Sequence, residues 1–212
     1  MMDSKSSISH SVRDISSALH SQKIQEKPCM VLGPFRSAGS QAVSILTSAF
    51  GIPQMSPISS SPVLDNQMRH PLFSRTTPSD TGTALLATKY LKGIGVTHCA
   101  VIYVNDGYGK AYNDAFVEIS KAHGIETRSF SFDFLVDNTQ DIQRAVHELV
   151  ATRFRYFFGI IYGPEHYDIV MEEAFIQKIA GSGYSWLFGN SVERYVQNVQ
   201  YPKGMNYKLS SS

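Results

Sequence analysis

Excess charge of either sign is missing from this 212-residue sequence. Its 19 Lys and Arg residues are nearly balanced by 18 Asp and Glu residues, so the net charge at pH 7 is +1. Nucleic acids and anionic membrane surfaces attract clusters of basic residues, and the sequence contains no such cluster. We therefore expect no nucleic-acid partner and no direct binding to a membrane surface.

Cysteine is scarce as well. The sequence has two cysteines, Cys29 and Cys99, and each lies in a short apolar run without a C-x-x-C partner. Free cysteine behaves as a small hydrophobic residue, so we expect two buried free thiols. The seven histidines are dispersed along the chain, and no metal site is predicted.

Several functional sequence signals are also missing. The N-terminal stretch MMDSKSSISHSVRDISS lacks the apolar core of a signal peptide, and no window approaches the ~20 apolar residues of a membrane span. GPFRSAGS (33–40) lacks the Gly-Lys-Ser/Thr of a P-loop, and neither a dinucleotide fingerprint, a nucleophile elbow nor H-E-x-x-H occurs. We therefore predict no catalytic site, no metal and no cofactor.

What the sequence does contain is a regular alternation of strand-like and helix-like segments. Such alternation is typical of βαβ units, and continuously apolar strands indicate a parallel sheet covered on both faces. The fold class is therefore α/β. Strands are expected at 29–34, 52–57, 97–104, 125–134, 155–163 and 184–190, and helices at 11–24, 37–50, 80–95, 111–124, 139–153 and 165–181.

Ligands of open α/β sheets bind beyond the carboxyl ends of the strands. Ser37 opens the helix after the first strand, where a serine either caps the helix or contacts an anionic ligand. Asp80 follows Ser79 at the start of another helix, and capping alone would explain it. Tyr108 stands between two glycines in a turn, where it either covers the core or faces a ligand.

The polar stretch 59–80 is longer than most loops, and long loops are often functional. LFSRTT inside it alternates as a strand does. Together with its neighbours it forms a recognisable series, which reads GPFRS, IPQMS, SSSPVLDN, FSRTTPSD and DGYG in this order. The series resembles the receptor-family ligand-binding region of the type 1 periplasmic-binding-protein superfamily, from about Ser11 to Ser191. That family includes ectodomains of metabotropic glutamate, GABA-B and natriuretic peptide receptors.

The resemblance implies a bilobed, Venus-flytrap-like structure of which this chain is a fragment. Residues 11–78 would form part of lobe 1 and residues 79–205 lobe 2, with LFSRTT as a hinge crossing. The opening β-α-β segment of the family would be missing, so lobe 1 would be incomplete. Residues 1–10 are expected to be a disordered tail and residues 206–212 a second tail.

The resemblance also implies a set of ligand-binding residues. Ser37 and Ser60 would hold a carboxylate with their hydroxyls, Ile58 would contribute a backbone contact, and Asp80 and Tyr108 would lie over an amine. Ser191 belongs to the turn after the last strand, where the amino-acid receptors have an acidic residue and this chain reads Gly-Asn-Ser. This departure weakens the case for an α-amino acid. Arg36 beside Ser37 either favours a more anionic ligand or is solvated.

The predicted function is therefore the extracellular ligand-binding module of a plasma-membrane receptor. A small polar or amino-acid-like ligand, or an organic anion, would bind between the lobes and signal by hinge closure, in a homo- or heterodimer formed through lobe 1. In the family such modules belong to class C G-protein-coupled receptors or guanylyl cyclases. The alternatives are a soluble solute-binding protein of a transporter, an unrelated α/β enzyme, and a truncated product that binds nothing and associates through exposed sheet edges.

Overall fold

The computed structural model describes residues 7–21, 28–133, 139–161 and 163–189. The chain divides into two compact units, Met1–Leu86 with Asp106–Ile119, and Ala87–Asn105 with Ser120–Ser212. The first unit thus includes residues on both sides of the predicted lobe boundary at residue 79, and the lobe limits stay a prediction.

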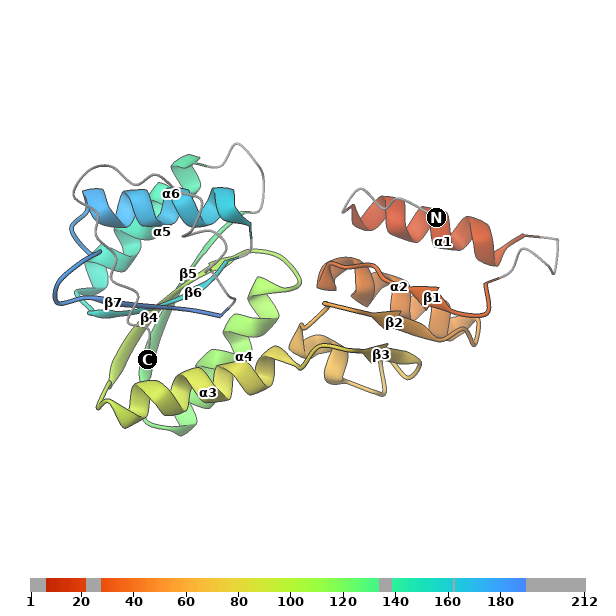
Figure 1. Ribbon diagram of the computed structural model, residues 1–212, viewed down its shortest axis with the longest axis horizontal. Coiled ribbons are helices and arrows are strands. Elements are labelled where there is room, and N and C mark those ends of the chain that lie inside the picture. Colours follow the sequence, from red (N-terminus) through yellow and green to blue (C-terminus); the bar gives the residue numbers. More distant parts are fainter. Residues whose placement is uncertain (1–6, 22–27, 134–138, 162, 190–212) are drawn as a thin grey trace. The chain divides into compact units, whose positions relative to one another are not determined.

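The first unit contains a three-stranded parallel sheet in the order β1-β2-β3 (Figure 1). The strand predicted inside LFSRTT is confirmed, because Phe73 of β3 is in register with Gln54 of β2. The strands are β1 (Val31–Leu32), β2 (Gln54–Ser56) and β3 (Phe73–Arg75). The helices are α1 (Ile8–Leu19), α2 (Ser37–Ala49), a short 3-10 helix η2 (Pro62–Asp65), the first part of α3 (Asp80–Gly93) and most of α4 (Gly109–Ala122).

Helix α1 begins earlier than the sequence pattern predicts. The predicted helix starts at Ser11, whereas α1 starts at Ile8, within the stretch expected to be a tail. The Ser7 side chain explains the earlier start, because its hydroxyl accepts a hydrogen bond from the His10 amide as a helix N-cap does. The helix packs against α2.

The second unit contains a four-stranded parallel sheet in the order β5-β4-β6-β7. Its strands are β4 (His98–Val104), β5 (Glu126–Phe132), β6 (Tyr156–Ile160) and β7 (Ser185–Phe188). The helices α5 (Thr139–Thr152) and α6 (Pro164–Ile176) pack against each other beside this sheet, and α4 (Gly109–Ala122) contributes its last residues to the unit (Figure 1). The predicted parallel α/β architecture is confirmed.

The core of the second unit lies on the two central strands. Val101 and Ile102 of β4 and Phe157 of β6 have no exposed surface, as expected for strands covered on both faces. Two residues further along β6, Gly159 pairs with Phe188 of β7. A Cβ atom at Gly159 would lie 2.6 Å from the Phe188 ring, so the strand pair leaves no room for a side chain there.

The two cysteines have different environments. Cys99 on β4 is buried and free as predicted, and burial raises the pKa of its thiol to about 12. The expectation for Cys29 is wrong, because Cys29 is exposed. It lies before β1, which begins only at Val31, so Cys29 is outside the sheet. Within the described ranges, no group of three or more His, Cys, Asp or Glu side chains is placed to hold a metal ion. None of the described helices combines the length and the apolar content that crossing a bilayer requires.

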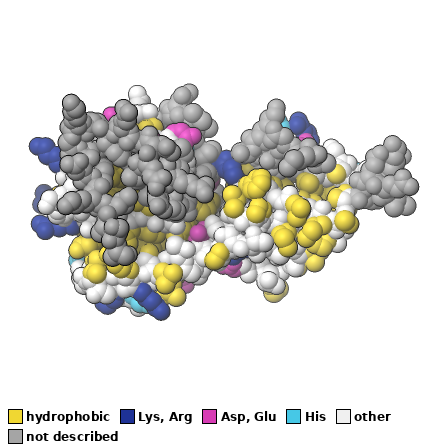
Figure 2. Space-filling model, viewed as in Figure 1, with side chains coloured by type: hydrophobic (Ala, Val, Ile, Leu, Met, Phe, Trp, Pro, Cys, Tyr) yellow, Lys and Arg dark blue, Asp and Glu magenta, His cyan; other side chains and the backbone are white. Residues whose placement is uncertain are grey.

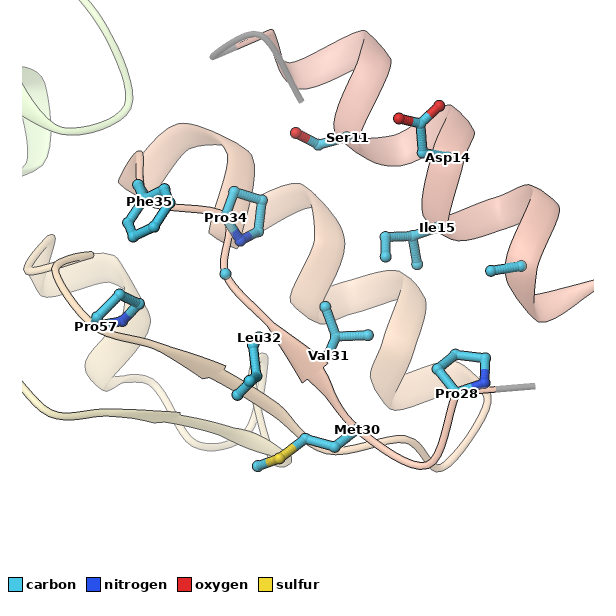
Figure 3. Close-up of a pocket in the computed structure, with 12 residues that line it drawn as sticks. Ser11, Asp14, Ile15, Pro28, Met30, Val31, Leu32, Pro34, Phe35 and Pro57 are labelled. Atoms are coloured by element: carbon cyan, nitrogen blue, oxygen red, sulfur yellow. The ribbon is translucent and has the colours of Figure 1, made fainter. Parts of the chain in front are cut away.

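Apolar side chains gather beside β1 (Figure 2). Leu32 is 76% exposed, and Met30 and Phe35 are also exposed. A cavity of about 460 Å³ lies between α1 and this strand, and Figure 3 shows its walls, with Ser11 and Ile15 on the helix and Val31 on the strand. Among the described strands, β1 pairs only with β2, so its other edge is open. An unpaired strand edge beside exposed apolar side chains favours association with another chain.

We expect the 212-residue chain to associate with itself through this edge, and Leu32→Lys to weaken the association. A lysine removes an apolar side chain and adds repulsion between copies, so the dissociation constant should rise about tenfold or more. Sedimentation velocity over a concentration series measures it. Leu86→Lys, which replaces another exposed leucine on α3, is the matched control. Equal effects of the two substitutions would contradict association through β1.

Candidate ligand-binding site

The segment after β2, residues 59–61, connects most of the predicted site residues and is here called the serine loop. Ser59 is fully buried and anchors it. Its hydroxyl lies 2.8 Å from that of Ser40 and 2.9 Å from that of Ser56, and it donates to the Phe35 carbonyl at 3.0 Å. The buried hydroxyls therefore satisfy one another, and they fix the loop against the turn between β1 and α2.

Ser37 contacts the serine loop from α2. It is the first residue of the helix and not its N-cap, which is Arg36, so the capping interpretation of Ser37 is wrong. Its hydroxyl instead accepts a hydrogen bond of 3.2 Å from the Ser61 amide. A serine hydroxyl that accepts a bond keeps its own hydrogen for donation. The buried Ser37 hydroxyl therefore keeps the capacity to donate one hydrogen bond.

Asp80 contacts the serine loop from α3. Its amide donates to the Ser60 carbonyl at 2.9 Å, and its carboxylate accepts a hydrogen bond from the Ser60 side chain. Asp80 is only 5% exposed. One oxygen of its carboxylate, Oδ2, is buried and has no hydrogen-bond partner among the described residues.

Burial raises the pKa of Asp80 to about 6. The hydrogen bond from Ser60 and the positive charge of Arg75 oppose this rise, whereas the negative charge of Asp65 adds to it. Near neutral pH the group is nevertheless mostly ionised, because its pKa lies below 7. The first unit therefore holds a buried carboxylate whose Oδ2 has no donor in the part of the chain that the structure describes.

Arg75 at the end of β3 supports the loop from another side. Its guanidinium donates to the carbonyls of Ser59 at 3.3 Å and Ser61 at 3.0 Å. It also forms an ion pair with Asp65, which accepts a hydrogen bond of 2.6 Å from the Ser79 hydroxyl. The arginine of FSRTT thus holds the serine loop in place beside the start of α3.

The turn that carries Tyr108 also reaches the serine loop. The Gln41 side-chain amide donates to the Gly107 carbonyl at 2.9 Å and to the Ser61 hydroxyl at 3.2 Å. At Gly107 a Cβ atom would lie 3.3 Å from that of Ala38, so a glycine lets the turn approach α2 closely. Tyr108 is buried, and its ring meets Tyr112 edge-on with centroids 6.0 Å apart.

The structure therefore brings four predicted residues to the serine loop, either directly or through their neighbours, namely Ser37, Ser60, Asp80 and Tyr108. Ile58 lies beside the loop with its side chain 60% exposed. Ser191 lies outside the described residues. The sequence analysis did not identify the three side chains that hold the loop, which are Gln41, Ser61 and Arg75. The only available signal was that Ser61 and Arg75 fall within the recognised motifs.

The interpretation of Arg36 as a solvated residue is wrong. Its guanidinium forms an ion pair of 3.0 Å with Asp106. The two side chains are 25% and 13% exposed, so the pair is largely shielded from water.

A serine and a histidine also meet in the first unit, at a distance that would suit nucleophilic catalysis. Ser44 Oγ lies 2.5 Å from His70 Nδ1. Both residues are buried, and burial together with the charge of Arg69 lowers the pKa of His70. A nucleophile has to meet its substrate. This enclosed pair is therefore a structural contact and gives no support to the enzyme alternative.

Comparison with known proteins shows which family this chain resembles in sequence. Residues 1–206 match the sequence model of the receptor family ligand binding region. The probable metabotropic glutamate receptor mgl-1 of Caenorhabditis elegans is 26% identical over 196 residues, which is 89% of this chain and 19% of that protein. Metabotropic glutamate receptor 6 of Rattus norvegicus is 30% identical over 99 residues, or 47% of this chain and 11% of that protein.

A third relative is the G-protein coupled receptor family C group 6 member A of Carassius auratus. It is 33% identical over 106 residues, which is 50% of this chain and 12% of that protein. The chain thus spans about a fifth or less of the length of these relatives.

Proposed function

Because the chain belongs to the receptor family ligand-binding region, we propose that it serves as the extracellular ligand-binding module of a membrane receptor. The ligand is a small polar or amino-acid-like molecule that favours closure of the two predicted lobes. It can do so only by binding the closed arrangement more tightly than the open one. The names of the relatives support a G-protein-coupled receptor as the larger protein.

The observation that carries this proposal is the buried carboxylate of Asp80. Its Oδ2 has no partner among the described residues, although a buried acceptor of this kind is normally hydrogen-bonded. An ammonium group would supply both the missing donor and a compensating charge. We therefore assign Asp80 to the amine of the ligand.

The opposite end of such a ligand would meet Ser37. The Ser37 hydroxyl retains a hydrogen for donation, and the N-terminus of α2 favours negative charge. The hydrogen bonds to the Gly107 carbonyl hold the turn that carries Tyr108 at the serine loop. We therefore expect Tyr108 to cover the ligand. Ser60, Ile58 and Ser191 remain proposed ligand contacts on the resemblance alone.

A dimer formed through lobe 1 is part of the proposal. Ile45 lies on α2 and Phe50 immediately follows the helix, and both side chains are about half exposed. Apolar side chains of this size on an exposed helix are a typical feature of a protein interface.

A thermal-shift screen of the chain against amino acids and small organic acids tests the proposed function. Ligand at ~100 times its Kd stabilises a protein by about 2.7 kcal/mol, which is readily measured. Ser37→Ala and Tyr108→Ala should each lower the affinity for a ligand found in the screen about tenfold or more, because each substitution removes a contact with that ligand. Ser74→Ala and Tyr90→Ala change the same residue types away from the serine loop and serve as matched controls.

The two substitutions and their controls also define the contrary outcome. A ligand whose affinity falls equally in all four variants does not bind at the serine loop. A chain that melts cooperatively but shifts with no compound would refute the small-molecule proposal and leave the family assignment intact.

A further inference from the structure

The charges around the serine loop bear on which ligands the proposed site accepts. Arg36 immediately precedes Ser37 and is paired with Asp106. Arg75 donates to the serine loop and is paired with Asp65. The two arginines and two aspartates cancel, and Asp80 adds one negative charge when it is ionised.

Asp106 also shapes the turn that carries Tyr108. Its Oδ2 accepts from Arg36, whereas its Oδ1 accepts from the amides of Tyr108 and Gly109, each at 2.9 Å. The second pair of bonds caps the start of α4 as an aspartate N-cap does. One carboxylate thus neutralises the cation next to Ser37 and at the same time positions Tyr108.

We propose that the Arg36–Asp106 ion pair makes the site select a zwitterion with an uncharged side chain over a ligand with a second carboxylate. This inference rests on the proposed function and deepens it. A zwitterion matches the site, because its ammonium group faces Asp80 and its carboxylate faces Ser37. A second carboxylate would meet no unpaired cation among the described residues of the loop and turn, and it would be repelled by Asp80.

The direct test compares L-glutamine with L-glutamate, which have nearly the same shape and differ by one negative charge. The unaltered chain should bind glutamine about tenfold or more tightly than glutamate. Asp106→Asn removes the negative charge beside Arg36 and should shift the affinity ratio toward glutamate by about tenfold. Arg36→Gln added to Asp106→Asn should cancel that shift, because the cation that attracts the extra carboxylate is then gone.

A positioning readout accompanies the affinities. Arg36→Gln should speed hydrogen exchange at the amides of Tyr108 and Gly109 about tenfold, because Asp106 loses the partner that orients it. Arg36→Lys should restore most of the protection, since it keeps the charge. Arg128→Gln changes an exposed arginine of β5 and controls for the loss of one positive charge.

The outcomes separate this inference from the proposed function. One outcome is that the chain binds amino acids with a ratio of glutamine affinity to glutamate affinity that is near one or is unaffected by Asp106→Asn. In that case the charge selection is wrong and the receptor proposal stands. If neither an amino acid nor a small organic acid binds to any variant, the proposed function fails and the selection fails with it. Unchanged exchange in Arg36→Gln overturns the positioning role in either case.

Discussion

Replacing Asp80 by asparagine is expected to change how the stability of this protein depends on pH. In the folded chain the pKa of Asp80 is raised to about 6 by burial, whereas an unfolded aspartate titrates near 3.8. Between these values the folded state holds the proton that the unfolded state has already lost. The free energy of unfolding of the unaltered chain therefore falls as the pH rises from about 4 to about 6, and it then stays level.

The expected effect is large because the shift spans about two pH units. At ~1.4 kcal/mol per unit, ionised Asp80 destabilises the fold by about 3 kcal/mol above pH 6, relative to strongly acidic solution. About 2 kcal/mol of this should appear between pH 4.5 and 7.5. The stability of Asp80→Asn minus that of the unaltered chain should rise by this amount over that range.

Denaturant unfolding followed by circular dichroism at several pH values measures this difference. Taking the difference removes the contributions of titratable groups common to both proteins. One of them is His70, whose lowered pKa destabilises the fold in acidic solution. Asp114→Asn, at an exposed position of α4, is the control for the loss of one carboxylate. A flat profile for Asp80→Asn would show that the carboxyl is not buried as described, and the proposed ammonium site would lose its basis.

Replacing Gly159 by alanine is expected to destabilise the second unit by about 2 to 3 kcal/mol, because a Cβ atom there would overlap the Phe188 ring. The ring has little freedom to move. It stacks on Trp186 with centroids 6.0 Å apart and meets Tyr167 at 5.0 Å. For a chain of this length, the melting temperature should fall by about 5 to 10 °C.

Trp186 is the single tryptophan of the chain and contacts Phe157 in the same unit, so its fluorescence reports unfolding there. Phe188→Leu combined with Gly159→Ala should recover part of the loss, because a smaller side chain leaves room for the new methyl group. Gly82→Ala is the matched control, since nothing lies within 4 Å of a Cβ atom at that helical position. A melting temperature for Gly159→Ala equal to that of the control would contradict the close packing of β6 and β7.

Local sequence patterns determined the elements and their order. The segment predicted as a strand at 97–104 is apolar from Cys99 onward, and β4 occupies His98–Val104. The apolar spacing at 139–153 predicts a helix, and α5 occupies Thr139–Thr152 with Ile142, Val146 and Leu149 buried as expected. These features could be predicted because burial of one helical stripe, or of both faces of a strand, leaves a period that neighbouring residues record. The series of motifs from GPFRS to DGYG indicated the family.

Only the tertiary structure decided which of those residues contact one another. Ser37 accepts from Ser61, 24 positions away, and Gln41 reaches Gly107 across 66 positions. Such bonds leave no period in the sequence, so the sequence predicts neither the Ser37–Ser61 bond nor the contact that Gln41 makes. Arg36 alone fits either a solvated residue or an anion-binding one, and its pairing with Asp106 appears only when two distant turns are brought together. Composition and periodicity are local quantities, whereas charge neutralisation and the burial of Asp80 depend on which distant segments the fold places side by side.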